Sequence, residues 1–175
     1  MYFAMPVRSV VLTLALLTLG SGSPAIADDH RPPMAFLRMG TLARGKLVEL
    51  EWTAGSGRRC RVIDRQREFR FPQADHVEYG LHSGRLRFIT PHRPRGVRIL
   101  AWFAAEERRR PIGPPEELEY ELHALRKKDR TVAWEAVFGL TVVNNRYLAV
   151  RARWPDRDGC SGAQKALWTF HVRPA

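Results

Sequence analysis

The chain has few cysteines, lysines and serines for its length, and these shortages exclude several classes of protein. Two cysteines in 175 residues are too few for a disulfide-dense miniprotein. After residue 27 only Ser56, Ser83 and Ser161 remain, each next to glycine, where turn formation explains it. The apolar fraction of 45% alongside 27% charged residues excludes a disordered polyelectrolyte and a coiled coil. Length and composition therefore predict one ordinary globular domain.

Sequence motifs for catalysis and nucleotide binding are also absent. There is no G-x-S-x-G elbow, H-E-x-x-H, P-loop or G-x-G-x-x-G. Carboxylate pairs such as Glu49 and Glu51 occur, but a spacing of two on a strand makes them the solvent-facing half of an alternation. The sequence predicts a protein that is not an enzyme, with the reservation that catalytic residues gathered from distant loops leave no motif.

The first 27 residues have the pattern of a secretory signal peptide. Arg8 supplies a positive charge, residues 10–20 form an unbroken apolar run, and Ala25-Ile26-Ala27 matches an A-x-A cleavage site. The run is shorter than the roughly 20 residues of a membrane span, and no second run follows it. We therefore expect a periplasmic or secreted protein with no transmembrane segment in the mature chain. Its parts are a signal peptide (1–27), an N-terminal extension (28–44) and a single β-sandwich domain (45–175).

Export would place the two cysteines in an oxidising compartment, where a pair of thiols usually forms a disulfide. Cys60 and Cys160 each lie beside a glycine-rich turn, at 55–60 and 158–162. There is no C-x-x-C motif and no histidine close to either cysteine in the sequence. The sequence predicts a structural disulfide between Cys60 and Cys160, with a reactive or metal-binding thiol pair as the alternative.

Apolar and polar residues alternate along most of the mature chain, with turn signals every 8 to 12 residues. Strands are expected at 46–53, 97–105, 131–143, 147–154 and 166–172, together with a hairpin at 76–88 that turns at Ser83-Gly84. Residues 116–127 also alternate, which favours a strand turning back through Lys128-Asp129-Arg130. Prolines at the start of this segment and leucines at 118, 122 and 125 fit a helix as the alternative. Eight or nine short strands predict an all-β fold, an antiparallel β-sandwich.

The last two expected strands resemble those of a known fold family. Segments 147–156 and 168–172, joined by an Asp/Gly loop, resemble the closing hairpin of bacterial immunoglobulin-like domains. The resemblance implies an immunoglobulin-like β-sandwich, a fold that carries many unrelated functions. The hairpin also resembles that of periplasmic copper-binding sandwiches, which place ligand histidines where this chain has Cys160 and, at the mature N-terminus, Asp28. Because both histidines are missing, the chain is not assigned to the copper-binding family.

Several histidines are candidate metal ligands, although no cofactor is predicted. If cleavage follows Ala27, the mature chain begins Asp28-Asp29-His30, whose α-amine, two amide nitrogens and imidazole form a square-planar set that suits Cu(II) or Ni(II). His76 and His82 lie on one face of an expected strand, and His92 follows the hairpin. A solvated polar face is the simpler explanation of these histidines. The alternative is a periplasmic copper- or nickel-binding protein that uses Asp28, Asp29, His30, His76 and His82.

Arginine carries an unusual excess of positive charge. Without the leader, which holds one arginine and no acid, 28 basic and 18 acidic residues remain, a net charge of +10, and 24 of the bases are arginine. A guanidinium can bind carboxylate, sulfate or phosphate through two hydrogen bonds. A GC-rich genome would explain the preference for arginine over lysine, but it does not explain the net charge. The candidate binding residues are Arg85, Arg87, Arg93, Arg95, Arg98, Arg151 and Arg153.

These observations predict an exported, non-catalytic binding domain with a basic, arginine-rich surface. The expected partner is an anionic envelope polymer or another envelope protein. Nucleic acid is not expected as the primary partner, because export separates the protein from it and the aromatic residues fall on the apolar side of the strands.

Overall fold

The computed structural model describes residues 32–54, 60–72, 76–79, 83–104, 111–140, 145–156, 162 and 164–174, and of residues 76–79 it describes the backbone alone. Within these residues the chain forms twelve β-strands and no helix, so none of them belongs to a helix that could cross a membrane. The strands are β1 (Met34–Met39), β2 (Thr41–Arg44), β3 (Lys46–Ala54), β4 (Arg61–Gln66), β5 (His76–Tyr79), β6 (Ser83–Ile89), β7 (Gly96–Ala104), β8 (Pro111–Leu118), β9 (Tyr120–Lys127), β10 (Arg130–Gly139), β11 (Arg146–Trp154) and β12 (Gln164–Pro174). The all-β prediction is confirmed, and residues 116–127 are strand rather than helix.

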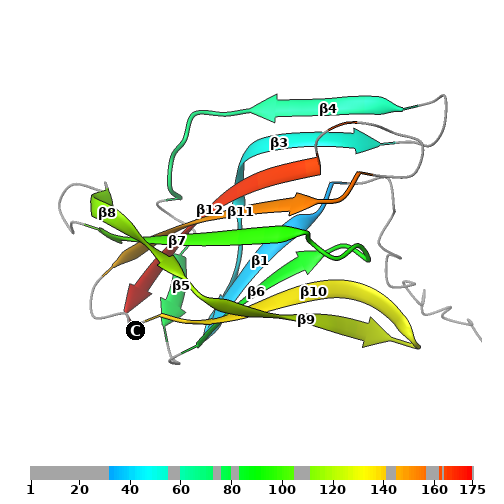
Figure 1. Cartoon of the computed structure of the whole chain (residues 1–175). Coiled ribbons are helices and arrows are strands. Elements are labelled where there is room, and N and C mark those ends of the chain that lie inside the picture. The colour runs from blue at the N-terminus through cyan, green and yellow to red at the C-terminus, as the bar shows by residue number, and fades with distance from the viewer. Residues whose placement is uncertain are drawn as a thin grey trace, which may run out of the picture.

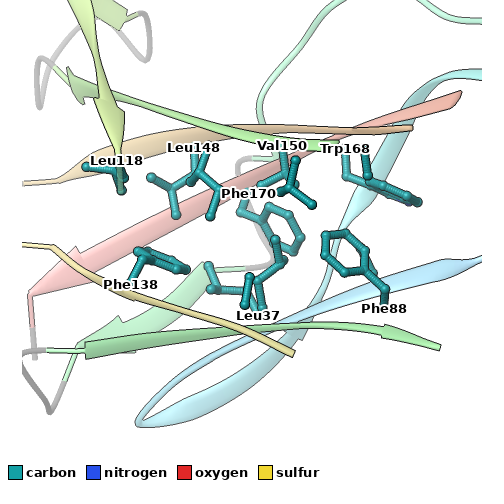
Figure 2. Packing of buried hydrophobic residues seen from close by; sticks show 14 of the residues in the cluster. Leu37, Phe88, Leu118, Phe138, Leu148, Val150, Trp168 and Phe170 are labelled. Atoms are coloured by element: carbon teal, nitrogen blue, oxygen red, sulfur yellow. The ribbon is translucent and has the colours of Figure 1, made fainter. Parts of the chain in front are cut away.

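Two sheets face each other and enclose the core (Figure 1). The first has the order β2-β1-β6-β10-β9, and the second has the order β4-β3-β12-β11-β7-β8, with β5 paired to β12. All pairs are antiparallel except β5–β12. Side chains from both inner faces meet in the middle, where Phe88 of one sheet packs near Trp168 of the other, with ring centroids 5.8 Å apart (Figure 2). This is the sandwich that the alternating sequence predicts.

The chain passes from one sheet to the other at two corners. Gly45 separates β2 of the first sheet from β3 of the second, and Glu119 separates β9 of the first sheet from β8 of the second. A Cβ atom at Gly45 would lie 2.6 Å from Cζ of the buried Phe170, so this corner has no room for a side chain. The β8–β9 corner joins the edge strands of the two sheets, and the β2–β3 corner joins the edge strand β2 to β3, which lies inside the second sheet.

Strand β5 pairs with the part of β12 that lies beyond the end of the β3–β12 ladder. The pairing of β3 with β12 ends at Lys46 and Thr169, and β5 pairs with β12 from His171 onward. The predicted hairpin between β5 and β6 is therefore wrong, because β6 pairs with β1 and β10 instead. Ser83-Gly84 is the start of β6 and not a turn. A Cβ at Gly84 would lie 2.4 Å from Cζ of Phe138, so glycine here provides space for an aromatic ring.

Residues 34–44, assigned from the sequence to an extension outside the domain, form β1 and β2 of the first sheet. β1 lies between β2 and β6, and its residues Ala35, Leu37 and Met39 are buried in the core. The alternation of these three apolar residues is the sequence signal that would have predicted a strand here. The sandwich therefore includes residues 34–44.

The segment at 67–72 crosses the outer face of the second sheet and covers a smaller cluster of buried residues. Phe71 stacks on Tyr147 with ring centroids 4.5 Å apart and makes an edge contact with Trp102. The backbone of Arg67 donates to the carbonyl of Val48, and the Thr169 hydroxyl donates to the carbonyl of Arg70. This part of the outer face is therefore buried beneath a loop.

The predicted signal peptide and Cys160 lie outside the described residues. Cys60 immediately precedes β4, and no described cysteine is a free thiol. The Cys60–Cys160 disulfide therefore stays a prediction.

Candidate anion-binding surfaces

The seven arginines predicted to form one basic surface lie in three different places. Arg85 and Arg87 are on the outer face of the first sheet, because their neighbours Leu86 and Phe88 point into the core. Arg98, Arg151 and Arg153 are on the outer face of the second sheet. Arg93 and Arg95 lie in the connection from β6 to β7, which joins the two sheets at one end of the sandwich.

The arginines on the outer face of the second sheet are largely paired with acids. Arg98 Nε and Nη2 donate to the two carboxylate oxygens of Glu117 at 3.0 and 2.6 Å, which links β7 to β8. This bidentate bond, and then the attraction of opposite charges, raises the pKa of Arg98, and the same bond lowers the pKa of Glu117. Arg151 Nη2 lies 3.7 Å from Glu49 Oε2. An anionic ligand here would have to compete with these carboxylates.

Lys165 on β12 is held in the same way by two acids of β3. Its Nζ lies 2.9 Å from Glu51 Oε2 and 3.1 Å from Glu49 Oε1. The hydrogen bonds to Glu51 and then Glu49 raise the pKa of Lys165. The cation is therefore used to join two strands of the sheet.

Arg85 and Arg87 share one carboxylate, that of Glu135 on β10. Glu135 is directly opposite Arg87 in the register, its side chain is 8% exposed, and its oxygens lie 3.1 Å from Arg87 and 3.6 Å from Arg85. One buried negative charge thus faces two partly exposed positive charges. Because one carboxylate neutralises only one of the two arginines, this face keeps an excess of positive charge.

The connection that carries Arg93 and Arg95 is fixed by hydrogen bonds to its backbone. Two buried or half-buried indoles donate to its carbonyls: Trp134 Nε1 to Pro91 at 3.2 Å, and Trp154 Nε1 to His92 at 3.1 Å. The backbone N–H of Arg95 donates to the carbonyl of Arg153 at 2.7 Å. The Arg93 guanidinium lies over the Trp134 ring, 5.5 Å from its centroid. Such a loop presents its charges with little conformational entropy left to lose on binding.

One end of the sandwich gathers a larger group of exposed cations that make no ion pair with any described residue. At this end β3, β6, β9 and β11 finish and β4, β7, β10 and β12 begin, on the right of Figure 1. We call this group the basic end; its members are Arg61, Arg93, Arg95, Arg126, Lys127, Lys128, Arg130 and Arg153. The acids described in the same loops and strand ends are Asp129 and Asp156. The charge of the basic end is therefore strongly positive.

Five members of the basic end are not among the binding residues predicted from the sequence. Arg126, Lys127, Lys128 and Arg130 belong to the β9–β10 hairpin, whose turn residues Lys128 and Asp129 have φ of 49° and 61°. This left-handed pair is the geometry of a type I′ turn. The hairpin was predicted, so the cations at its tip could have been placed at a strand end. Arg61 begins β4, on the other side of the same end of the sandwich, and its position depends on the sheet order, which the sequence does not specify.

Arg146 was also missed, because nothing near it in the sequence marks it as a buried cation. Its side chain is 3% exposed and its Nη2 lies 2.7 Å from Glu116 Oε2, while the guanidinium carbon is 3.9 Å from the centroid of the Phe103 ring. Its Nε and Nη1 are buried with no hydrogen-bond partner among the described residues. A buried guanidinium with so few partners is energetically costly.

The candidate metal ligands are not assembled by the described part of the chain. Asp28, Asp29, His30 and His82 lie outside it, and His76 is in β5, with its backbone in register with His171 of β12. Among the residues whose side chains are described, no group of three or more histidine, cysteine or acidic side chains could hold a metal ion.

Comparison with known proteins gave no match: no family model fits the chain, and neither a curated protein nor a solved structure resembles it significantly. The functional argument therefore depends on the charges and their geometry.

Proposed function

We propose that this protein is an exported, non-catalytic binding domain whose basic end engages an anionic component of the cell envelope, either a polymer or an acidic protein. The observation that carries the proposal is the contrast between two groups of cations. Arg98, Arg151 and Lys165 of the second sheet are matched with Glu49, Glu51 and Glu117, whereas the members of the basic end have no ion-pair partner among the described residues. Unpaired guanidinium groups are free to bind phosphate, sulfate or carboxylate. The immunoglobulin-like type of the sandwich belongs to the same proposal.

The rigidity of the 90–95 connection supports the proposal. Hydrogen bonds from the indoles of Trp134 and Trp154 and from the backbone N–H of Arg95 fix its course, and Pro91 and Pro94 restrict its dihedral angles. Arg93, Arg95 and Arg153 are thereby presented together, because Arg95 is bonded to the backbone of Arg153. An anion meeting these groups does not have to order the loop first.

Retention on an immobilised heparin matrix tests the proposal. The purified protein is expected to bind at low salt, to elute as salt rises, and to be unaffected by EDTA, because screened electrostatic attraction and not a metal ion carries the binding. Replacing two members of the basic end, Arg93→Gln and Arg95→Gln, should lower the eluting salt concentration clearly. The matched control is Arg65→Gln with Arg67→Gln, which removes the same charge from exposed positions on and next to β4.

Equal retention of both double variants would contradict a role for the basic end, because net charge alone would then explain binding. Loss of binding in EDTA would favour a metal-dependent function instead. Capture of a single envelope protein by crosslinking through the basic end would identify the acidic-protein form of the proposal.

A further inference from the structure

The outer face of the first sheet carries a second arrangement of charges that the basic end does not include. β1, β2 and β6 are neighbours, and directly opposite residues of antiparallel strands point to the same side. Because Ala35, Leu37 and Leu86 point into the core, the alternate residues point outward. We call this surface the outer β1 face; its members are Met34, Phe36, Arg38, Leu42, Arg44, Arg85 and Arg87.

Apolar and basic side chains are interleaved on the outer β1 face, although Arg38 is also directly opposite Arg85. Across the strands, Leu42 is opposite Arg38, and Phe36 is opposite Arg44 on one side and Arg87 on the other. Along β1, Phe36 is followed by Arg38 on the same side of the sheet. The apolar members are accessible: Leu42 is 65% exposed and Met34 is 40% exposed.

The charge of the outer β1 face is positive and only partly compensated. Arg85 and Arg87 share the buried Glu135, while Arg38 and Arg44 are exposed and have no ion-pair partner among the described residues. A second copy of the chain placed face to face would bring these arginines against each other. Like charges in contact are unfavourable, so the face is poorly suited to self-association.

The interleaving also distinguishes between the remaining partners. A typical protein-binding site has a continuous apolar centre with a polar rim. On the outer β1 face arginines instead flank two of the apolar side chains: Leu42 is opposite Arg38, and Phe36 lies between Arg44 and Arg87. The headgroup region of a membrane offers phosphates and the ends of acyl chains together, so guanidinium groups bind phosphate while Leu42 and Met34 enter the surface at shallow depth.

We infer that the outer β1 face docks on an anionic lipid surface. Arg38, Arg44 and the Arg85–Arg87 pair bind the lipid phosphates, and Leu42 and Met34 provide the apolar contact. This goes beyond the proposed function, because it uses a different surface and a different partner. The two surfaces can therefore be tested separately.

Cosedimentation with vesicles tests the inference. The purified protein is expected to bind vesicles of mixed phosphatidylglycerol and phosphatidylcholine and not vesicles of phosphatidylcholine alone. Arg38→Gln with Arg44→Gln should lower the partition coefficient roughly 10- to 30-fold at low salt. Leu42→Asn should lower it about fivefold. All three positions are exposed, so these changes should leave folding intact.

Two control variants match these changes elsewhere on the molecule. Val62 on β4 is 61% exposed, so Val62→Asn removes a comparable aliphatic side chain and should leave vesicle binding unchanged. Arg65→Gln with Arg67→Gln removes the same charge from positions on and next to β4 and should cause a smaller loss. Arg93→Gln with Arg95→Gln, which tests the basic end, should affect heparin retention more than vesicle binding.

Three results would overturn the inference. The first is no binding to phosphatidylglycerol vesicles at all. The second is equal loss in Leu42→Asn and Val62→Asn, or in the two arginine double variants, which would assign any binding to net charge. The third is a dimer in analytical ultracentrifugation that Leu42→Asn dissociates, because a second copy would then be the occupant of the outer β1 face.

Discussion

At the scale of single residues, Arg146 is the least favourably placed charge among the described residues. Its guanidinium is buried, bonded to the 60% exposed side chain of Glu116, and leaves two buried donors without described partners. We predict that Arg146→Met leaves the free energy of unfolding near that of the parent protein or raises it, because the replacement removes the cost of burying a charge. Glu116→Gln should lower it by about 1–3 kcal/mol, because the guanidinium then loses its counter-charge.

Urea unfolding of both variants measures this difference. A larger loss for Arg146→Met than for Glu116→Gln would contradict the prediction and would show that the stacking of Arg146 on Phe103 outweighs the cost of burial.

The Arg98–Glu117 bond predicts a dependence on pH. The pKa of Glu117 in the folded protein is below the ordinary value of 4.5, because Arg98 donates two hydrogen bonds to the carboxylate. The bond therefore contributes its full stabilisation above pH 4.5 and loses it as the pH falls through the lowered pKa. An NMR titration of the Glu117 carboxyl should give a midpoint below 4.5 that moves back toward 4.5 in Arg98→Gln. Identical midpoints in the two proteins would refute this.

At the scale of elements, the β2–β3 corner depends on the absence of a side chain at Gly45. Gly45→Ala would place a Cβ 2.6 Å from Cζ of Phe170 and 3.0 Å from Cβ of Trp168, both of which are buried. We predict a loss of about 1–3 kcal/mol in the free energy of unfolding, typical of overpacking in a filled core. Urea unfolding measures it. Gly96→Ala is the control, because nothing lies within 4 Å of a Cβ there, and an equal loss in both variants would contradict the explanation.

The elements that could be predicted from the sequence are those whose neighbours in space are also neighbours in sequence. The β11–β12 and β9–β10 pairs were expected, and both are antiparallel hairpins. β5 was paired with the wrong strand, because a parallel pairing with β12 joins residues about a hundred positions apart and leaves no local signal. Gly84 was read as a turn residue, although its role is to make room for Phe138 in three dimensions.

At the scale of the whole molecule, the sequence indicated a basic surface but not that its arginines lie in three separate places, some of them paired with acids. Arginines at alternate positions were expected to share a face, and Arg85 and Arg87 do. The sequence does not show the pairing of Arg151 with Glu49, which joins strands about a hundred residues apart. The pairing of Arg98 with Glu117 joins consecutive strands, but it depends on a β7–β8 register that shifts between Ala101 and Phe103. Nor could the sequence bring the β9–β10 turn and the 90–95 connection to the same end, which requires the order of strands in both sheets.

The disulfide predicted between Cys60 and Cys160 would link two loops at the same end of the second sheet. Cys60 precedes Arg61, which pairs with Ala54, and Gln164 Nε2 donates to the carbonyl of Thr53, so one loop begins on β3 and the other leads into its neighbour β12. A bridge closing a loop of about 100 residues would stabilise the fold by up to about 4.7 kcal/mol, through the restricted unfolded chain. We predict that the unfolded, unreduced protein shows no free thiol with Ellman's reagent and that reduction lowers the urea midpoint markedly. Cys60→Ala with Cys160→Ala should match the reduced protein, and two reactive thiols in the unreduced protein would refute the bridge.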